Sequence, residues 1–277
     1  MAHFYTEEGE ARHEVKTASK TAKKPTRPST IADARKNGWL PSATTILDII
    51  GAEGLVTWKM DQICRFAREV DDQVSHAGAL LHAKQQMGKH LDAAAEGGNV
   101  LHNDLEVYAP YWMKGQRDPR RGHWNKLLDD AGVVEILYSE RMMASREIGY
   151  AGTGDLLGVN ELGQLVVFDL KTKDTKGKVE RNKTYKNEKY ELQLGCYANL
   201  ARKDSCPKIQ AAVKKGIVSV IAYVSRDEEI QEEGQEPRRW TKVDKFDEIQ
   251  TLDAGIAYQA LFEVWTWSKK YDPRMEF

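Results

Sequence analysis

The stretch Gly149-Tyr-Ala-Gly-Thr-Gly-Asp155-Leu-Leu-Gly-Val-Asn-Glu-Leu-Gly-Gln-Leu-Val-Val-Phe-Asp169-Leu-Lys171 decides the fold of this chain. Residues 155–159 and 164–170 are rich in aliphatic and β-branched side chains, and the segment between them carries a turn signal. The stretch therefore predicts an antiparallel hairpin. Facing residues of a hairpin have sequence numbers with a constant sum, so a turn centred near Leu162 places Asp155 opposite Asp169, with Lys171 on the same face.

Two carboxylates and an ammonium would thus share one face of the hairpin. Carboxylates roughly 5 Å apart repel each other, and a hard divalent cation such as Mg²⁺ or Mn²⁺ relieves the repulsion through oxygen ligands. The alternative is an exposed strand pair with ordinary surface charges. The second strand is apolar on both faces, from Val166 to Phe168 and at Leu170. This pattern indicates a sheet covered on both sides and favours the metal site.

The composition is that of a globular protein. Of the 277 residues, 41% are hydrophobic and 30% are charged, and 42 acidic residues nearly balance 41 basic ones. This balance gives no sign of a nucleic-acid partner, which only a local cluster of basic residues could indicate. The length permits one large domain or two small ones, and we expect one domain with appendages.

The cysteine spacing and the absence of long apolar runs exclude several classes of protein. Cys64, Cys196 and Cys206 lack the paired short spacings of a zinc or iron-sulfur site, so we expect reduced thiols. The sequence contains no run of eighteen apolar residues and no apolar region near its amino terminus. Neither a membrane span nor a signal peptide is expected, and a cytoplasmic location follows.

The first 38 residues contain few large apolar side chains. Eight Lys or Arg residues lie between Arg12 and Lys36, against only Glu14 and Asp33. A flexible basic arm is therefore expected over residues 1–38. Such an arm is either a non-specific phosphate tether or a solvated tail.

Helices are expected to follow this arm. A helix capped by Ser42 or Thr44 is expected to continue to about Val74, and strong helix formers follow up to Ala95. The pair Gly97-Gly98 is expected to break the helix before a new one begins.

The helix after that break carries His102 and Glu106, which are four residues apart and share a helical face. Four other central histidines lie in an Ala- and Gln-rich helix or in a loop, where a lone histidine is more often a surface or hydrogen-bonded residue than a ligand. These are His76, His82, His90 and His123.

Two later segments combine basic residues with other features. Residues 107–124 interleave Tyr and Trp with Lys and Arg, which suits either a groove for single-stranded nucleic acid or the rim of a core. Residues 172–189 contain few apolar residues and are expected to form a basic loop beside the metal site. Its seven basic residues are Lys173, Lys176, Lys178, Arg181, Lys183, Lys186 and Lys189. This loop would concentrate a phosphodiester substrate, or it is an ordinary solvated excursion.

The remaining elements complete a mixed α/β pattern. Strands are expected at residues 133–143, where Glu140 lies, at 217–224 and, as a short edge strand, at 239–243. Between the last two, residues 227–236 are expected to form an acidic loop. Helices are expected at residues 190–201 and 246–269. The first carries Gln193, Tyr197 and Leu200 on one stripe, and the expected core residues of the second are Leu252, Ile256, Leu261, Val264 and Trp265.

Five motifs in this order resemble those of the PD-(D/E)XK nucleases, specifically the RecB-like exonuclease branch of phages and bacterial recombination systems. The motifs are Pro41-Ser-Ala-Thr-Thr-Ile-Leu47 with Trp58-Lys59 following, Gly98-Asn-Val-Leu-His102-Asn-Asp-Leu-Glu106, Glu140 on the first core strand, Gly154-Asp155 with Asp169-Leu-Lys171, and Gln193-Leu-Gly-Cys-Tyr197. The resemblance spans residues 39 to about 201 and extends weakly to Tyr271. Gly154 stands where the family name has Pro, and the four cysteines of relatives with iron-sulfur clusters are absent, so no cluster is expected.

The resemblance implies a restriction-endonuclease-like mixed sheet flanked by helices. It places one nuclease domain at residues 39–277, with a helical portion at 39–130 and the sheet core and closing helices at 131–277. It implies one or two Mg²⁺ or Mn²⁺ ions bound by Asp155, Asp169, the Leu170 carbonyl group and His102, with Glu140 as an outer or second-metal ligand. Lys171 would orient the attacking water, and Gln193 and Tyr197 would position Lys171 or a phosphate oxygen.

The function implied is a metal-dependent DNA exonuclease of phage or bacterial recombination, repair or degradation. DNA is the expected substrate, and a recombination or single-strand-annealing protein is a candidate partner. A structure-specific or restriction-type endonuclease is the alternative, because the same core supports it. A non-catalytic DNA-binding protein is the second alternative, although such a protein does not need mutually repelling carboxylates at this spacing.

Overall fold

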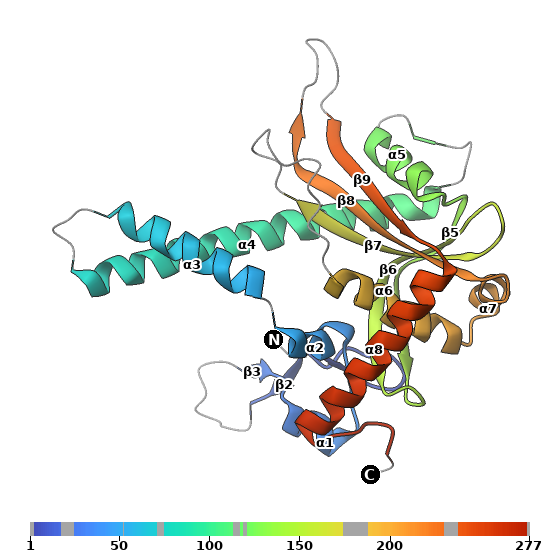
Figure 1. The fold of residues 1–277 in the computed structure, drawn as a ribbon, viewed down its shortest axis with the longest axis horizontal. Helices are drawn as coiled ribbons and strands as arrows, with labels where there is room; N and C mark the ends of the chain where they lie inside the picture. Colours follow the sequence, from blue (N-terminus) through green and yellow to red (C-terminus); the bar gives the residue numbers. More distant parts are fainter. Residues whose placement is uncertain are drawn as a thin grey trace.

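The computed structural model describes residues 3–17, 25–51, 53–70, 75–112, 117–118, 121–173, 188–229 and 238–275. Its centre is a five-stranded sheet with the order β5-β6-β7-β8-β9 (Figure 1). The strands are β5 (Glu135–Ser145), β6 (Tyr150–Val159), β7 (Leu165–Lys173), β8 (Ile217–Glu229) and β9 (Arg238–Phe246). Neighbouring strands are antiparallel except β7 and β8, which are parallel.

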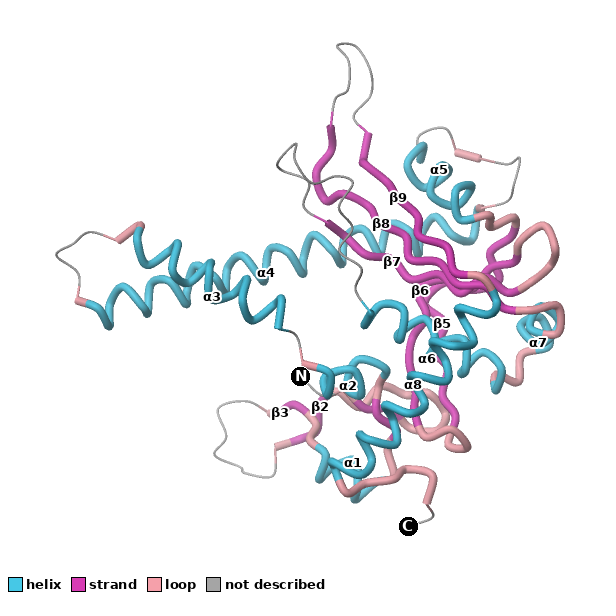
Figure 2. Tube along the Cα trace, in the orientation of Figure 1, coloured by secondary structure: helices cyan, strands magenta, loops and turns pink. Residues whose placement is uncertain are grey.

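Helices cover both faces of this sheet (Figure 2). One face packs under α6 (Glu188–Lys203), α7 (Pro207–Val213) and α8 (Glu248–Lys269), and the other under α5 (Gly122–Ala131) and the end of α4 (His76–Tyr108). Along β7, Leu165 and Val167 belong to the first core, whereas Val166 and Phe168 belong to the second. The predicted α/β class, a mixed sheet flanked by helices, is confirmed.

The hairpin has the predicted register. Leu156 pairs with Phe168 and Val159 with Leu165, so the residue numbers of every pair add up to the same value. The same sum places Asp155 and Asp169 in the next opposed positions of β6 and β7. This register follows from the turn alone, because Asn160 Oδ1 accepts hydrogen bonds from the backbone N–H groups of Leu162 and Gln164.

The predicted break at Gly97-Gly98 is wrong, because α4 continues through both glycines. A Cβ on Gly98 would lie 3.3 Å from Thr172 Oγ1, and one on Gly97 would lie 3.1 Å from Arg226 Cδ. Each glycine costs a helix only about 1 kcal/mol. Here the missing side chains let α4 approach the ends of β7 and β8.

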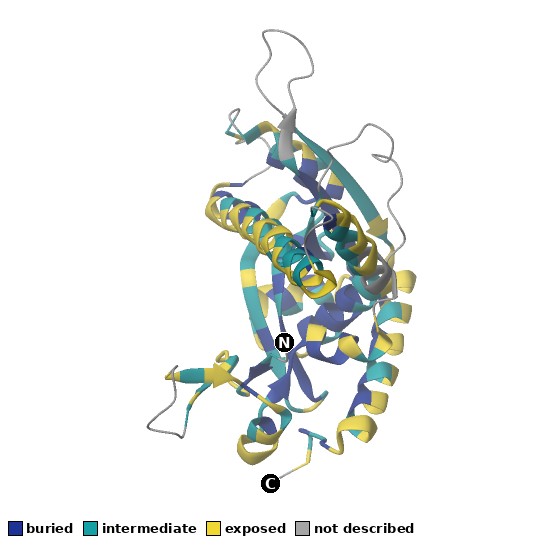
Figure 3. Cartoon of the chain, turned by 90° about the vertical axis from the view of Figure 1, so that its left-hand side faces the viewer, coloured by how far each residue is buried: buried dark blue, intermediate teal, exposed yellow. Residues whose placement is uncertain are grey.

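The helix predicted up to Val74 is divided into shorter elements. Ser42 is the N-cap of α2 (Ala43–Leu47), and its Oγ accepts a hydrogen bond from Thr45 N at 3.1 Å. A 3₁₀ turn (Asp48–Ile50) follows, and α3 (Glu53–Arg68) begins after Gly51, which has a φ of 71°. A positive φ cannot continue a right-handed helix. Helix α3 and the first part of α4 then extend from the body as a hairpin whose described side chains are mostly exposed (Figures 1 and 3).

The described parts of residues 1–38 are folded, in contrast to the flexible arm expected from composition. Strand β1 (Phe4–Tyr5) pairs with β4 (Leu40–Pro41), β2 (Glu14–Lys16) pairs with β3 (Thr26–Pro28), and α1 is Ile31–Asn37. Phe4 and Ala34 are fully buried in the first core. A few well-placed apolar side chains therefore anchor a segment whose average composition is polar.

The residues of α8 that the sequence predicts to face the core are mostly not the ones that the structure buries. Leu252, Ile256 and Val264 are exposed, and Leu261 and Trp265 lie on or beside the buried face. That face is set by Tyr258, Phe262 and Trp265, which are larger and bury more area per residue.

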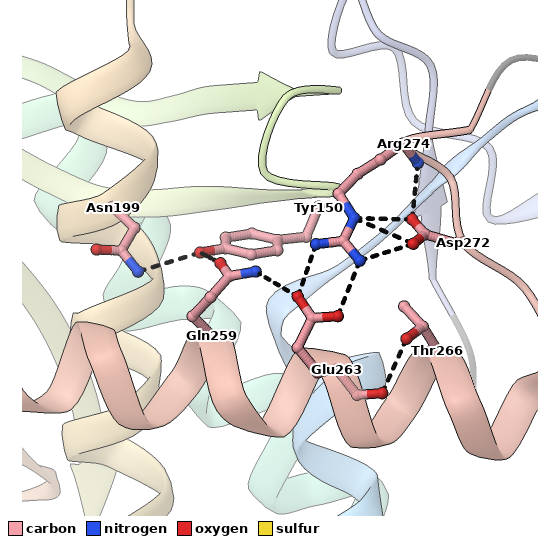
Figure 4. Close-up of polar contacts among 7 residues, drawn as sticks. All are labelled: Tyr150, Asn199, Gln259, Glu263, Thr266, Asp272 and Arg274. Atoms are coloured by element: carbon pink, nitrogen blue, oxygen red, sulfur yellow. Dashed lines mark hydrogen bonds and ion pairs between the residues drawn. The ribbon is translucent and has the colours of Figure 1, made fainter.

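Polar contacts fix the end of α8 to the start of β6 (Figure 4). The Tyr150 hydroxyl accepts a hydrogen bond from Asn199 Nδ2 at 3.1 Å and donates one to Gln259 Oε1 at 3.2 Å. Arg274 forms ion pairs with Glu263 and Asp272, each at 2.6 Å. Arg274 thus ties the carboxy-terminal segment to α8, and Tyr150 ties α6 and α8 to the start of β6.

Other predicted segments have mixed outcomes. The basic loop falls mainly on residues 174–187 and most of the acidic loop on 230–237, outside the described residues. In the segment 107–124, Tyr108, Trp112 and Trp124 are core residues, while Tyr111 is 74% exposed. The core-rim interpretation therefore holds for three of its four aromatic residues.

All three cysteines are free thiols. Within the described residues, no helix has the length and apolar character needed to cross a bilayer.

The crossing of α6 and α8 yields a stability prediction. A Cβ on Gly195 would lie 2.3 Å from the Ala254 carbonyl carbon. Gly195→Ala is therefore expected to lower the free energy of unfolding by about 2–3 kcal/mol, as measured by chemical denaturation. Gly88→Ala is the matched control, because nothing lies within 4 Å of its Cβ position and alanine favours a helix by about 1 kcal/mol. Equal effects of the two substitutions would contradict this account.

Candidate active site

Three possible metal ligands meet where β5, β6 and α4 converge. Nδ1 of His102 lies 3.5 Å from Oδ1 of Asp155 and 3.9 Å from Oε1 of Glu140. One ligand atom from each residue lies within 4.8 Å of the others. The site has one nitrogen and two carboxylate donors from three separate elements, and His102 reaches it because α4 remains one helix through its glycines.

Glu140 reaches this cluster from an unusual backbone conformation. Its φ is +48°, and only one other non-glycine residue in the described chain has a positive φ. On either side of it, Ser139 pairs with Leu156 and Arg141 with Gly154, so Glu140 falls opposite Asp155. A left-handed residue inside a strand costs of order 1–3 kcal/mol and is most often retained at a functional site.

Asp155 is held by the neighbouring strand. Its Oδ2 accepts a hydrogen bond from the backbone N–H of Leu170 at 2.6 Å. Its side chain is 14% exposed, and Oδ1 is the oxygen that faces His102. One oxygen is therefore fixed by the sheet while the other remains directed into the cluster.

Asp169 and Lys171 form a buried ion pair beside this cluster. Lys171 Nζ lies 2.6 Å from Asp169 Oδ2, and the side chains are 19% and 1% exposed. Lys171 Nζ also donates a hydrogen bond to Gln193 Oε1 at 3.1 Å, and Gln193 Nε2 donates one to the Tyr197 hydroxyl at 2.7 Å. Asp169, Lys171, Gln193 and Tyr197 are therefore joined by a continuous set of contacts.

The pKa shifts reflect burial and the excess of carboxylates. Burial, assisted by the charge of Asp155, raises the pKa of Asp169 to about 6 even though Lys171 opposes this shift. Burial opposes ionisation of Lys171, but the carboxylates of Asp169 and Asp155 raise its pKa. Despite burial, hydrogen bonds and charge interactions with Asp155 and Glu140 raise the pKa of His102 to about 10. The surrounding carboxylates therefore stabilise the positive charges of Lys171 and His102. The same negative charge would favour binding of a divalent cation.

The donor set fits Mg²⁺ or Mn²⁺, which prefer carboxylate oxygens and, for Mn²⁺, accept an imidazole nitrogen. Of the five predicted metal ligands, the structure brings His102, Glu140 and Asp155 together. Asp169 instead contacts Lys171, and Leu170 contributes its N–H to Asp155. Binding by Asp169 and by the Leu170 carbonyl group stays a prediction.

Sequence reasoning missed Tyr190, whose ring centroid lies 4.7 Å from Lys171 Nζ. The signal was present, because Tyr190 precedes Gln193 by three residues and shares its helical face. Glu106 shares a face with His102 in sequence but is exposed and outside the cluster. Of the other histidines, His123 lies 4.0 Å from Asp104, and His90 packs against Phe66.

Asp155 thus lies on β6 and the Asp169-Leu-Lys171 motif on the adjacent β7 of a five-stranded mixed sheet. Residues 58–262 match the family model of the PD-(D/E)XK nuclease superfamily. Because the match covers more than half of the chain, this protein belongs to the PD-(D/E)XK nuclease superfamily.

Other comparisons add little. No curated protein matches the chain. Among solved structures, the crystal structure of SSO0001 is similar over 81% of this chain and 95% of that chain, at 12% identity and a TM-score of 0.26. A likeness this low carries no argument about function.

The raised pKa of His102 predicts how metal binding depends on pH. In the metal-free protein the imidazolium contributes stability that is complete below about pH 6.5 and is lost as the pH rises through about 10. Because a metal binds only the neutral imidazole, apparent Mn²⁺ affinity should increase with pH, by up to about tenfold per unit.

His102→Ala is expected to weaken Mn²⁺ binding and to remove most of this pH dependence, as measured by calorimetric titration between pH 6.5 and 9. His90→Ala, on the same helix, serves as the control because its ring contacts Phe66 and not the cluster. If His102→Ala binds Mn²⁺ as the wild type does, His102 is not a ligand.

Proposed function

We propose that this nuclease is a divalent-metal-dependent DNA exonuclease of the RecB-like branch, acting in phage or bacterial recombination, repair or degradation. The observation that supports this most is the placement of the His102, Glu140 and Asp155 cluster beside the buried Asp169–Lys171 pair. The cluster is suited to a cation, and the pair places an ammonium group next to it. Both groups can stabilise the negative charge that develops on a phosphodiester during hydrolysis.

His102, Glu140 and Asp155 would hold Mg²⁺ or Mn²⁺, one ion or two, with Asp169 and the Leu170 carbonyl group completing the ligand set. A divalent cation polarises the scissile phosphate and lowers the pKa of an attacking water. The protein supplies the orientation of the ligands: the Leu170 N–H holds Asp155 in place at 2.6 Å.

Lys171 has two roles in this proposal. Its ammonium group orients the attacking water and offsets the negative charge that develops on the phosphate in the transition state. Asp169 keeps Lys171 protonated by raising its pKa. Gln193 fixes the direction of the ammonium group, and Tyr197, which is buried, fixes Gln193.

The test is digestion of DNA labelled at its 5′ or 3′ end, single- and double-stranded, with Mg²⁺ or Mn²⁺ and with an EDTA control. Mononucleotides or short oligomers released from free ends would support an exonuclease. Cleavage of covalently closed circles would instead support the structure-specific or restriction-type endonuclease. Binding without cleavage under all these conditions would support a non-catalytic DNA-binding protein.

We propose that residues 39–277 form a single nuclease domain with a helical portion up to residue 130, onto which the described parts of residues 1–38 pack. A recombination or single-strand-annealing protein is the partner that an exonuclease of this branch would need, and a cytoplasmic location would suit both. Pull-down with such a protein and localisation of a tagged chain would test these two points.

A further inference from the structure

A row of side chains leads away from Lys171 across three strands. In the parallel pairing of β7 and β8, Lys171 lies beside Tyr223, and in the antiparallel pairing of β8 and β9, Tyr223 lies beside Lys242. Because side chains alternate along a strand, Lys173 shares the face of Asp169 and Lys171. The row therefore begins at the candidate active site and ends at the edge strand of the sheet.

Two ammonium groups converge on the Tyr223 ring in this row. Lys173 Nζ lies 4.4 Å and Lys242 Nζ 6.0 Å from the ring centroid. The ring is almost fully buried, whereas the Lys242 side chain is 32% exposed. The face of an aromatic ring attracts a cation that packs against it. The two lysines are thus oriented by the sheet and remain accessible.

The charges in this row do not balance. Lys242 pairs with Asp244 at 2.9 Å, and Lys171 pairs with Asp169. Among the residues that the structure describes, no carboxylate forms an ion pair with Lys173. Burial, and the neighbouring charge of Lys242, lower the pKa of Lys173, although the charge of Asp244 opposes this shift. Holding this ammonium group beside another is therefore unfavourable in the free protein, and a bound anion would relieve the cost.

We propose that Lys173 and Lys242 form a phosphate-binding subsite that holds the substrate strand next to the bond cleaved at Lys171. Lys171 and Lys242 are separated by two strand spacings, about 10 Å, and a nucleic-acid strand carries a phosphate every few ångströms along this distance. The strand would cross β7, β8 and β9 and leave over the edge of the sheet. The inference rests on the proposed function, because it assumes that the anion is the substrate backbone.

The test compares Lys173→Gln, Lys242→Gln and the double variant with Lys245→Gln. Lys245 is the matched control, because it lies on the same strand as Lys242 but faces Gly132 on the opposite side of the sheet. Affinity for a fluorescently labelled single-stranded oligonucleotide is measured by anisotropy in EDTA over a series of salt concentrations. The steady-state cleavage of the same oligonucleotide with Mn²⁺ is measured in parallel.

Each lost phosphate contact should lower the salt dependence, the slope of log affinity against log salt, by about 0.7. The double variant is expected to bind at least about tenfold more weakly, with a slope lower by about 1.4, and to show its loss of cleavage mainly as a higher KM. Lys173→Arg and Lys242→Arg should retain binding, since they keep the charge. Lys245→Gln should behave as the wild type.

Equal affinity and salt slope for the double variant and Lys245→Gln would overturn the subsite, as would an arginine double variant that stays folded but binds as weakly as the glutamine one. This outcome is distinct from failure of the proposed function, which would appear as a wild-type protein that cleaves none of the DNA substrates.

Discussion

Asp169→Asn is expected to slow cleavage of linear DNA at least about 10³-fold with either Mg²⁺ or Mn²⁺. Asparagine has nearly the same shape, so the buried site can keep its packing, but the negative charge that holds Lys171 and attracts a cation is lost. Removing one preorganised electrostatic group from an active site costs on the order of 10²–10³ in rate. Here one charge serves both the ammonium group and the cation, so the larger figure is expected.

Single-turnover cleavage at saturating metal measures this effect, and circular dichroism confirms that the variant is folded. Asp92→Asn is the matched control, because Asp92 is an exposed residue of α4 outside the cluster. A rate for Asp169→Asn within tenfold of the wild type would remove Asp169 from the catalytic machinery.

Lys171→Met is expected to lower cleavage as strongly and to destabilise the fold more than Asp169→Asn, which leaves Lys171 its hydrogen bond to Gln193. Methionine fills much of the same volume but leaves the Asp169 carboxylate, which is 1% exposed, without its partner. Removing one member of a buried ion pair costs about 3–5 kcal/mol. The double variant Asp169→Asn with Lys171→Met should recover much of this stability, because no buried charge remains, while staying inactive.

The stability effect of Lys171→Met should depend on pH with a definite sign. The folded-state pKa of Asp169 is about 6, above its ordinary value of about 3.9, and it should rise further without Lys171. The deficit should therefore be largest near and above neutral pH and should shrink as acid protonates Asp169. Denaturant melts at pH 5 and pH 8 measure this, and a deficit that is equal at both values would show that lost packing, not the unpaired charge, destabilises the variant.

Much of the site could be predicted because its central signal is local. The turn after Val159 fixes which residues of β6 and β7 face each other, so the opposition of Asp155 and Asp169 follows from sequence numbers alone. The spacing of Gln193 and Tyr197 fixes their common face in the same way. Neither inference needed any knowledge of distant packing.

The predictions that failed depended on tertiary contacts. The low helix propensity of Gly97-Gly98 predicts a break in the helix. In the fold, α4 continues through both glycines and passes close to Thr172 there. Which face of α8 is buried depends on where its backbone at Ala254 and Gly255 meets Gly195, and apolar residues occur all around this helix. The left-handed backbone of Glu140 leaves no mark in the sequence, because nothing in its neighbours requires it.

The strand order also implies a sequence of events as the chain folds. Strands β5, β6 and β7 are consecutive and pair with their neighbours, whereas β8 joins β7 in parallel only after the chain has passed through α6 and α7. Closing the longer loop is slower, since more of the chain must be ordered before any contact forms. The strands bearing Glu140, Asp155 and Asp169 should therefore associate before Gln193 and Tyr223 arrive. In this nascent state the acidic residues of the site would be assembled while the surroundings of Lys171 are still missing.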